Sequence, residues 1–231
     1  MSKTNIFSTE NILFSDRQDA GRLLAARLPE YRGKNAVVLG IPRGGIIVAH
    51  EIAEALDADL DIVLSRKLRT PWHEELAMGS VAENGKVFLN QDVISEINIT
   101  PVEIDREKEV QMTEITRRSA LIRKVRPRVP LTGRIVIVTD DGIATGATIQ
   151  AALWSVRQEK PSYLIAAIPV GPAETIGELS GDVDEIVCLS TPPFFTAVGQ
   201  FYQNFNQVED GEVLEILESE NKRRTAGIMK S

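Results

Sequence analysis

The sequence has few of the side chains on which disulfides, metal centres and histidine-based catalysis depend. Its 231 residues include one cysteine, Cys188, and two histidines, His50 and His73. A single cysteine cannot form an internal disulfide, so the composition is typical of a protein from a reducing compartment. Neither histidine lies beside a serine in a nucleophile elbow, which argues against a nucleophilic hydrolase.

The chain also lacks long hydrophobic runs and an excess of positive charge. No apolar stretch reaches membrane-spanning length, and the first residues, MSKTNIFSTE, lack the apolar core of a signal peptide. We therefore expect a cytoplasmic protein with no membrane partner. Its 33 acidic and 26 basic residues give a net charge of −7, which argues against broad binding to nucleic acid. An anion-binding site must then be local.

The pattern of the remaining residues predicts an α/β fold. Short aliphatic and β-branched runs, typical of buried strands, alternate with segments whose apolar residues recur at helical spacing. This alternation favours a mostly parallel twisted sheet with helices on both faces, in a single domain over residues 1–231. The strands are expected at 36–41, 60–65, 135–138, 163–170 and 185–189, and the helices at 16–28, 45–56 and 172–180, with another after Thr148.

The segment 134–150, RIVIVTDDGIATGATIQ, is the most informative part of the chain. A strand ends at two carboxylates, Asp140 and Asp141, and a small, hydroxylated loop leads into a helix. Backbone N–H groups and the positive end of the helix dipole converge on such a loop and favour a phosphate. Because two aspartates would repel a phosphate, a sugar diol, a magnesium ion or both should lie between them. Alternatively, Asp and Thr side chains cap the turn only for local stability.

A second loop, Pro42-Arg43-Gly44-Gly45, links the expected strand at 36–41 to the next helix. Its adjacent glycines allow the backbone to approach an anion closely, and Arg43 adds a positive charge beside the helix start. This pattern predicts another phosphate-type site. The alternative is a tight turn in which the glycines adopt positive φ angles.

A basic segment follows the expected strand at 60–65, where Arg66, Lys67 and Arg69 place three cations in four residues. We expect an anion near them, or else a solvated basic loop. A hairpin is expected next, with arms at 80–83 and 87–90 around an Asn84-Gly85 turn, as a flap beside the site.

Residues 91–131 predict a helical insertion whose long helix begins near Pro101 and ends before Pro127. The helix is acidic early and basic late, which suits its dipole, and Glu114 and Arg118 are spaced to form an ion pair. The alternative is that the basic end faces an anion or an RNA partner. The aromatic C-terminal segment, 190–231, is expected to pack on or near the site.

The sequence TDDGIATGAT resembles the phosphoribosyl-diphosphate (PRPP) binding motif of type I phosphoribosyltransferases, in which two acidic residues after a strand precede a Thr-Gly-x-Thr loop. GIPRGG is similar to the pyrophosphate loop of that family. The resemblance implies that the acidic pair holds the ribose hydroxyls and that the two loops hold the phosphates. The implied catalytic residues are Asp140, Asp141, Lys67 and Arg43. The implied substrate-binding residues are Ala144, Thr145, Gly146, Ala147, Thr148, Pro42, Gly44, Gly45, Arg66 and Arg69.

The resemblance also implies a reaction of nucleotide metabolism. The family transfers 5-phosphoribosyl from PRPP, with Mg²⁺, to a nitrogen nucleophile such as a nucleobase and releases pyrophosphate. It implies no set of direct metal ligands, although Asp140 and Asp141 can reach the ion through water, and homodimers are common. In the family the acceptor base often lies against an aromatic ring, and the alternative is that the aromatic residues of this chain only pack the C-terminal segment onto the core. The candidates are Trp72, Phe194, Phe195, Phe201, Tyr202 and Phe205.

The overall pattern is most similar to stand-alone bacterial proteins with a phosphoribosyltransferase domain, although the insertion at 91–131 is longer than the usual connection. A regulator that binds PRPP or a nucleotide without catalysis would have the same fold and loops. A P-loop nucleotide hydrolase is disfavoured because IATGAT lacks the lysine that its loop requires.

Overall fold

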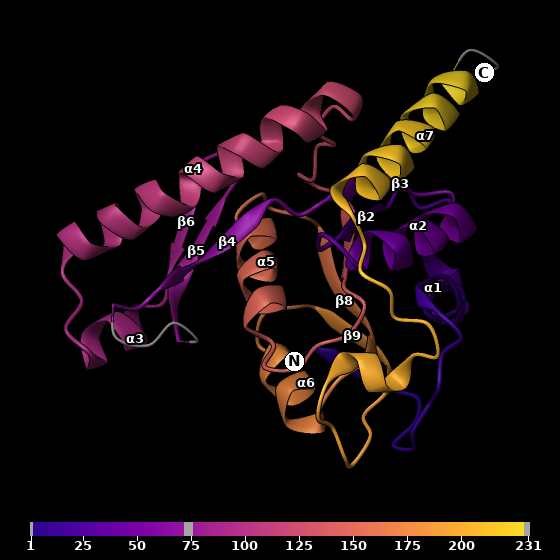
Figure 1. Ribbon diagram of the computed structural model, residues 1–231, viewed down its shortest axis with the longest axis horizontal. Coiled ribbons are helices and arrows are strands. Elements are labelled where there is room, and N and C mark those ends of the chain that lie inside the picture. Colours follow the sequence, from indigo (N-terminus) through magenta and orange to yellow (C-terminus); the bar gives the residue numbers. More distant parts are fainter. Residues whose placement is uncertain (1, 72–75, 229–231) are drawn as a thin grey trace.

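The computed structural model describes residues 2–71 and 76–228, and its centre is a six-stranded parallel sheet (Figure 1). The strand order is β1-β9-β8-β7-β2-β3. The strands are β1 (Lys3–Ile6), β2 (Val37–Gly40), β3 (Asp59–Ile62), β7 (Ile135–Thr139), β8 (Tyr163–Val170) and β9 (Glu185–Ser190). Every neighbouring pair runs parallel, as predicted. The edge strand β1 was not predicted, and β3 ends earlier than the expected strand at 60–65.

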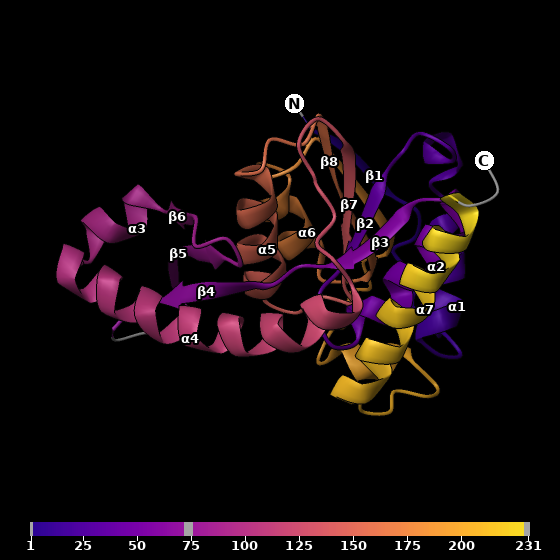
Figure 2. The same cartoon turned by 90° about the horizontal axis from the view of Figure 1, so that it is seen from above.

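Helices cover both faces of this sheet (Figure 2). On one face lie α1 (Arg17–Ala25), α2 (Gly45–Leu56) and α7 (Asp210–Ile228), and on the other lie α5 (Ala147–Arg157) and α6 (Ala173–Leu179). In β7, Val136 packs in the same apolar cluster as Leu153 of α5, whereas Ile137 packs in the cluster of Ile52 of α2. Such burial on both faces explains why the strands are apolar throughout. The predicted α/β fold is confirmed.

The ends of the first helix and the C-terminal segment differ from the prediction. Helix α1 begins at Arg17, where Asp16 accepts a hydrogen bond from the Asp19 N–H at 2.8 Å, and it ends at Ala25 rather than at Leu28. Short 3₁₀ turns, η1 (Pro29–Tyr31) and η2 (Val198–Phe201), and helix α7 were not predicted. Among the described residues, none of the helices combines the length and the apolar character needed to cross a membrane.

The chain between β3 and β7 forms an arm that projects from the sheet (Figures 1 and 2). It contains an antiparallel sheet of β4 (Ser65–Arg69), β5 (Ala77–Ala82) and β6 (Val87–Leu89), followed by α3 (Gln91–Glu96) and α4 (Pro101–Val125). The predicted hairpin is present, since β5 and β6 pair with Val81 opposite Val87. The predicted helix start is also confirmed, because Thr100 and Glu103 form a capping box before Pro101.

The basic segment is a strand rather than the expected loop. Arg66, Lys67 and Arg69 belong to β4, which pairs antiparallel with β5, and the intervening Leu68 is fully buried. Because successive side chains of a strand point to opposite faces, Arg66 shares the face of the buried Leu68, where it contacts Gln111 of α4, and Lys67 lies on the other face. The strand therefore fixes the direction in which the cations point.

Candidate functional site

The two predicted anion loops lie at the same edge of the central sheet. In the parallel register Gly40 of β2 is opposite Thr139 of β7, so the loops that follow these strands are neighbours. One loop, 41–44, leads into α2, and the other, 140–146, leads into α5. Ligands of open α/β sheets bind at this carboxyl edge, next to the first turns of the helices.

The glycine loop touches the acidic pair directly. A Cβ atom on Gly44 would lie 1.9 Å from Asp141 Oδ2, and one on Gly45 would lie 2.8 Å from the Asp140 Cα atom. Gly44 has a φ of −63°, and Gly45 is not among the glycines with positive φ. The glycines are therefore needed for close approach, not for the positive φ angles of a tight turn.

The loop before α5 leaves its helix start without a side-chain cap from the described residues. Gly146 adopts a φ of +73° immediately before the first helical residue, Ala147, and makes no side-chain capping bond. The Thr175 hydroxyl donates to the Ala144 carbonyl at 3.0 Å and fixes the loop from α6. The described part of the chain therefore does not form the capped turn that we considered as an alternative, and the first N–H groups of α5 face the loop.

The acidic pair is held by residues from distant parts of the chain. Arg17 Nε donates to Asp141 Oδ2 at 2.7 Å, and the Tyr202 hydroxyl donates to the Asp141 carbonyl at 2.5 Å. Asp140 Oδ1 accepts from the Asp141 N–H at 2.8 Å. Arg17 lies at the start of α1, where neighbouring charged residues such as Arg22 are largely exposed. Arg17 is instead buried and brings a cation to the acidic pair.

Burial is the main electrostatic influence on these two carboxyls. Burial, followed by the neighbouring charge of Asp141, raises the pKa of the Asp140 carboxyl well above its ordinary value. Burial also raises the pKa of Asp141, although the Arg17 guanidinium opposes the rise by favouring the ionised form. The pair therefore favours a ligand that brings positive charge or hydroxyl donors.

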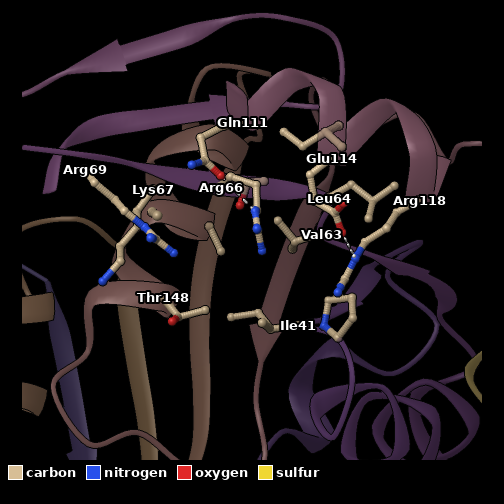
Figure 3. Close-up of a pocket in the computed structure, with 15 residues that line it drawn as sticks. Ile41, Val63, Leu64, Arg66, Lys67, Arg69, Gln111, Glu114, Arg118 and Thr148 are labelled. Atoms are coloured by element: carbon tan, nitrogen blue, oxygen red, sulfur yellow. Dashed lines mark hydrogen bonds and ion pairs between the residues drawn. The ribbon is translucent and has the colours of Figure 1, made fainter. Parts of the chain in front are cut away.

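A cavity of about 220 Å³ lies between the arm and the sheet (Figure 3). Figure 3 shows Arg66, Lys67 and Arg69 reaching from β4 toward the side where Thr148 and Ile41 lie. The remaining lining residues are Pro42, Val63, Leu64, Ser65, Gln111, Glu114, Ile115, Arg118, Ala151 and Ala152. The structure thus brings the basic strand close to parts of both anion loops. The acidic pair does not line this cavity.

Helix α4 orients the cations of this cavity. Arg66 Nε donates to Gln111 Oε1 at 3.0 Å, and Arg118 Nε donates to Glu114 Oε1 at 3.0 Å. Gln111 is only 6% exposed, so its amide is a fixed partner. Glu114 and Arg118 form the ion pair predicted from their spacing, and Arg118 also lines the cavity. The sequence did not single out Arg118 as a site residue, because its ion pair with Glu114 already accounted for a cation at that position of the helix.

Other predicted site residues lie apart from the cavity. Arg43 approaches Glu209 at 4.0 Å and lines a smaller neighbouring pocket together with Arg118. Among the aromatic candidates, Phe201 and Tyr202 are buried in the C-terminal packing, whereas Phe194 is 80% exposed. Trp72 lies outside the described residues.

The carboxylate oxygens of the acidic pair fit a magnesium ion whose other ligands are waters and the phosphates of a bound substrate. Among residues 2–71 and 76–228, no group of three or more His, Cys, Asp or Glu side chains gathers as a metal cluster. Mg²⁺ is commonly bound by one or two carboxylates together with waters and substrate phosphates. Asp140 Oδ2 accepts no hydrogen bond from the described residues, so it is suited to a water of such an ion or to a hydroxyl.

Comparison with known proteins identifies the class. The sequence model of the phosphoribosyl transferase domain family matches residues 8–206, and the chain belongs to this family. The chain is 39% identical to the protein TT1426 from Thermus thermophilus, with a TM-score of 0.86 over 90% of this chain and 99% of that protein. It is also 46% identical, over 89% of its length, to two Mycobacterium tuberculosis proteins provisionally named phosphoribosyl transferases, Rv0571c and MT0597. The match spans 46% of those relatives, about half their length.

Proposed function

We propose that this chain binds PRPP with Mg²⁺, transfers its 5-phosphoribosyl group to a nitrogen nucleophile, such as that of a nucleobase, and releases pyrophosphate. The observation that carries this proposal is the contact of Gly44 and Gly45 with Asp140 and Asp141, beside the uncapped start of α5. A diol-binding carboxylate pair between two anion loops suits a sugar that carries phosphate at both ends.

Each part of PRPP has a group of candidate residues. The 5′-phosphate would accept hydrogen bonds from the N–H groups and hydroxyls of the loop at the start of α5. That loop consists of Ala144, Thr145, Gly146, Ala147 and Thr148. The ribose hydroxyls would donate to Asp140 and Asp141. The pyrophosphate would contact Pro42, Gly44 and Gly45 together with Arg43 and the cations of β4.

The proposed catalysis is mainly electrostatic. As the bond to the anomeric carbon breaks, negative charge accumulates on the pyrophosphate and positive charge on the ribose ring. Arg43, Lys67 and the backbone N–H groups of the glycine loop would stabilise the leaving anion, with Arg66 and Arg69 in support. The carboxylates of Asp140 and Asp141 would favour positive charge on the sugar. A bound Mg²⁺ would neutralise part of the pyrophosphate charge, with Asp140 and Asp141 holding its waters.

Thermal and urea denaturation with PRPP and Mg²⁺ tests the ligand assignment. PRPP at a hundred times its dissociation constant should stabilise the wild type by about 2.7 kcal/mol. Asp140→Asn combined with Asp141→Asn should abolish this gain, while the control Glu178→Gln, on an exposed position of α6, should retain it. The absence of any gain in the wild type at millimolar PRPP would contradict the proposal.

A second measurement separates catalysis from regulation. Release of pyrophosphate from PRPP is followed while a panel of nucleobases is offered as acceptor. Pyrophosphate release that depends on one base supports the transferase. PRPP binding with no release for any base favours the regulator, which would keep the same fold and loops without transfer.

A further inference from the structure

Arg17 is a buried arginine whose place at the start of α1 is not explained by the helix itself. Its side chain is 9% exposed, and it occupies the first helical position, where the helix dipole disfavours a positive charge. Burying a guanidinium also costs desolvation energy unless an anion compensates. The compensating anion is Asp141, at 2.7 Å and 124 residues away along the chain.

The same guanidinium also holds the C-terminal segment. Arg17 donates through its Nη1 atom to the Asn206 carbonyl at 2.8 Å, and its guanidinium lies 3.9 Å from the centre of the Phe205 ring. Phe205 stacks on Tyr202, with ring centres 5.0 Å apart, and the Tyr202 hydroxyl donates to the Asp141 carbonyl. Residues 202–206 are therefore connected to Asp141 twice, once through Arg17 and once directly.

The two carboxylates accept hydrogen bonds from different sources, Asp141 from the distant Arg17 and Asp140 from the adjacent backbone N–H. Asp141 Oδ2 accepts from Arg17 and packs against Gly44, whose added Cβ would also lie 2.8 Å from Arg17 Nε. Asp140 Oδ2 accepts no hydrogen bond from the described residues. Each carboxylate is thus held through one oxygen and keeps the other for a ligand, but only Asp141 is held by a residue from a distant part of the chain.

We propose that Arg17 is a positioning residue of the phosphoribosyl site, which fixes the Asp141 carboxylate for a ribose hydroxyl and holds residues 202–206 beside the acidic pair. This inference rests on the proposed function, because it assigns the ribose to the acidic pair. We assign the effect of Arg17 to the sugar half of the site, because its hydrogen bonds go to Asp141 and to the Asn206 carbonyl. Arg17 lines none of the cavity that the cations of β4 and α4 surround.

The test compares two fragments of PRPP by titration calorimetry in the presence of Mg²⁺. Ribose 5-phosphate reports on the sugar half, and inorganic pyrophosphate reports on the anion half. Arg17→Gln should weaken ribose 5-phosphate binding roughly 10- to 100-fold, because a displaced Asp141 no longer meets the hydroxyl. Pyrophosphate binding should change less than about twofold. Arg17→Lys, which keeps the charge, should restore part of the ribose 5-phosphate affinity.

The matched control is Arg22→Gln, an arginine of the same helix that is 59% exposed and pairs with Asp19 and Glu51. This variant should bind both fragments as the wild type does. If Arg17→Gln also matches the wild type, or if it weakens both fragments equally, the positioning role is overturned. If the wild type binds neither PRPP nor ribose 5-phosphate, the proposed function fails instead.

A second variant keeps the proposal testable should Arg17→Gln not fold. Tyr202→Phe removes only the hydrogen bond to the Asp141 carbonyl and leaves the stacking on Phe205. It should weaken ribose 5-phosphate binding about threefold and leave pyrophosphate binding unchanged. Hydrogen exchange of residues 202–206 should also accelerate. If both the ribose 5-phosphate affinity and the hydrogen exchange of residues 202–206 stay unchanged, the proposed link between this segment and Asp141 is overturned.

Discussion

The acidic pair and the basic cavity are built in opposite ways. Asp140 and Asp141 lie in the core fold, and Arg17 and Tyr202 hold Asp141 from distant parts of the chain. The cations of the cavity lie on the arm, where neighbours on α4 orient Arg66 and Arg118. The proposed sugar half of the site therefore depends on contacts of the core fold, whereas the cations of the proposed anion half depend on how the arm is attached.

Arg123 attaches the arm, and its loss should have the largest effect. This arginine donates to both carboxylate oxygens of Glu83, at 2.7 and 2.8 Å, and to Asp61 Oδ1 at 2.7 Å. Asp61 lies on β3 and is 2% exposed. Because Arg123→Met leaves Asp61 buried without its cation, the free energy of unfolding should fall by about 3–5 kcal/mol. Urea denaturation measures the loss.

The acid sensitivity of this attachment sharpens the test. Burial opposes the ionised form of Glu83, but hydrogen bonds from Arg123 and Ser119 outweigh it and hold the pKa of Glu83 below its ordinary value. The contribution of Glu83 to stability is therefore present above an ordinary glutamate pKa of about 4.3 and is lost as the pH falls through the lowered value. Glu83→Gln should remove this acid dependence. An unchanged dependence would contradict the role of Glu83.

Asp140→Asn should act in the opposite direction on stability. In the wild type, burial raises the pKa of the Asp140 carboxyl. Without a ligand, the free energy of unfolding of the wild type therefore decreases as the pH rises through this raised pKa. The neutral amide avoids this cost and should increase the free energy of unfolding at pH 8 in the presence of a chelator. The same change should remove the gain of about 2.7 kcal/mol from saturating PRPP and Mg²⁺. If Asp140→Asn lowers the free energy of unfolding at pH 8, the buried Asp140 carboxylate is not a cost to the ligand-free fold, and the contrast with Glu83 fails.

The sequence contained the local signals of the site but not its long-range contacts. The strand before Asp140, the loop to Thr148 and the Pro42–Gly45 turn were each predictable from neighbouring residues. The contact of Arg17 with Asp141 was not, because nothing local couples residues 124 positions apart. The local indication of this contact was the positive charge of Arg17 at the first position of a helix, where the helix dipole disfavours a cation. The pairing of β4 with β5 likewise overrode the loop expected from three clustered cations.

Gly44→Ala tests the place where the two halves meet. Its Cβ would lie 1.9 Å from Asp141 Oδ2, so the loop must move away from the acidic pair. We expect a destabilisation of about 1–3 kcal/mol, as for other overpacked sites. Binding of both ribose 5-phosphate and pyrophosphate should weaken in calorimetry. Gly177→Ala on α6, where an added Cβ meets nothing within 4 Å, is the control. Selective loss of one fragment would show that the halves do not share this contact.

Arg118→Gln should have the smallest effect on the fold and an effect on the anion half alone. Arg118 lines the cavity with Pro42, and Glu114 holds its Nε atom at 3.0 Å. Loss of the partly exposed pair should change the free energy of unfolding by less than about 1 kcal/mol. Pyrophosphate affinity should fall roughly threefold to tenfold at low salt and less at high salt, because ions screen the lost charge. Arg117→Gln is a matched control, since Arg117 pairs with the same glutamate but does not line the cavity. Equal losses of pyrophosphate affinity in the two variants would mean that Arg118 makes no specific contact with the anion, and its place in the anion half would be withdrawn.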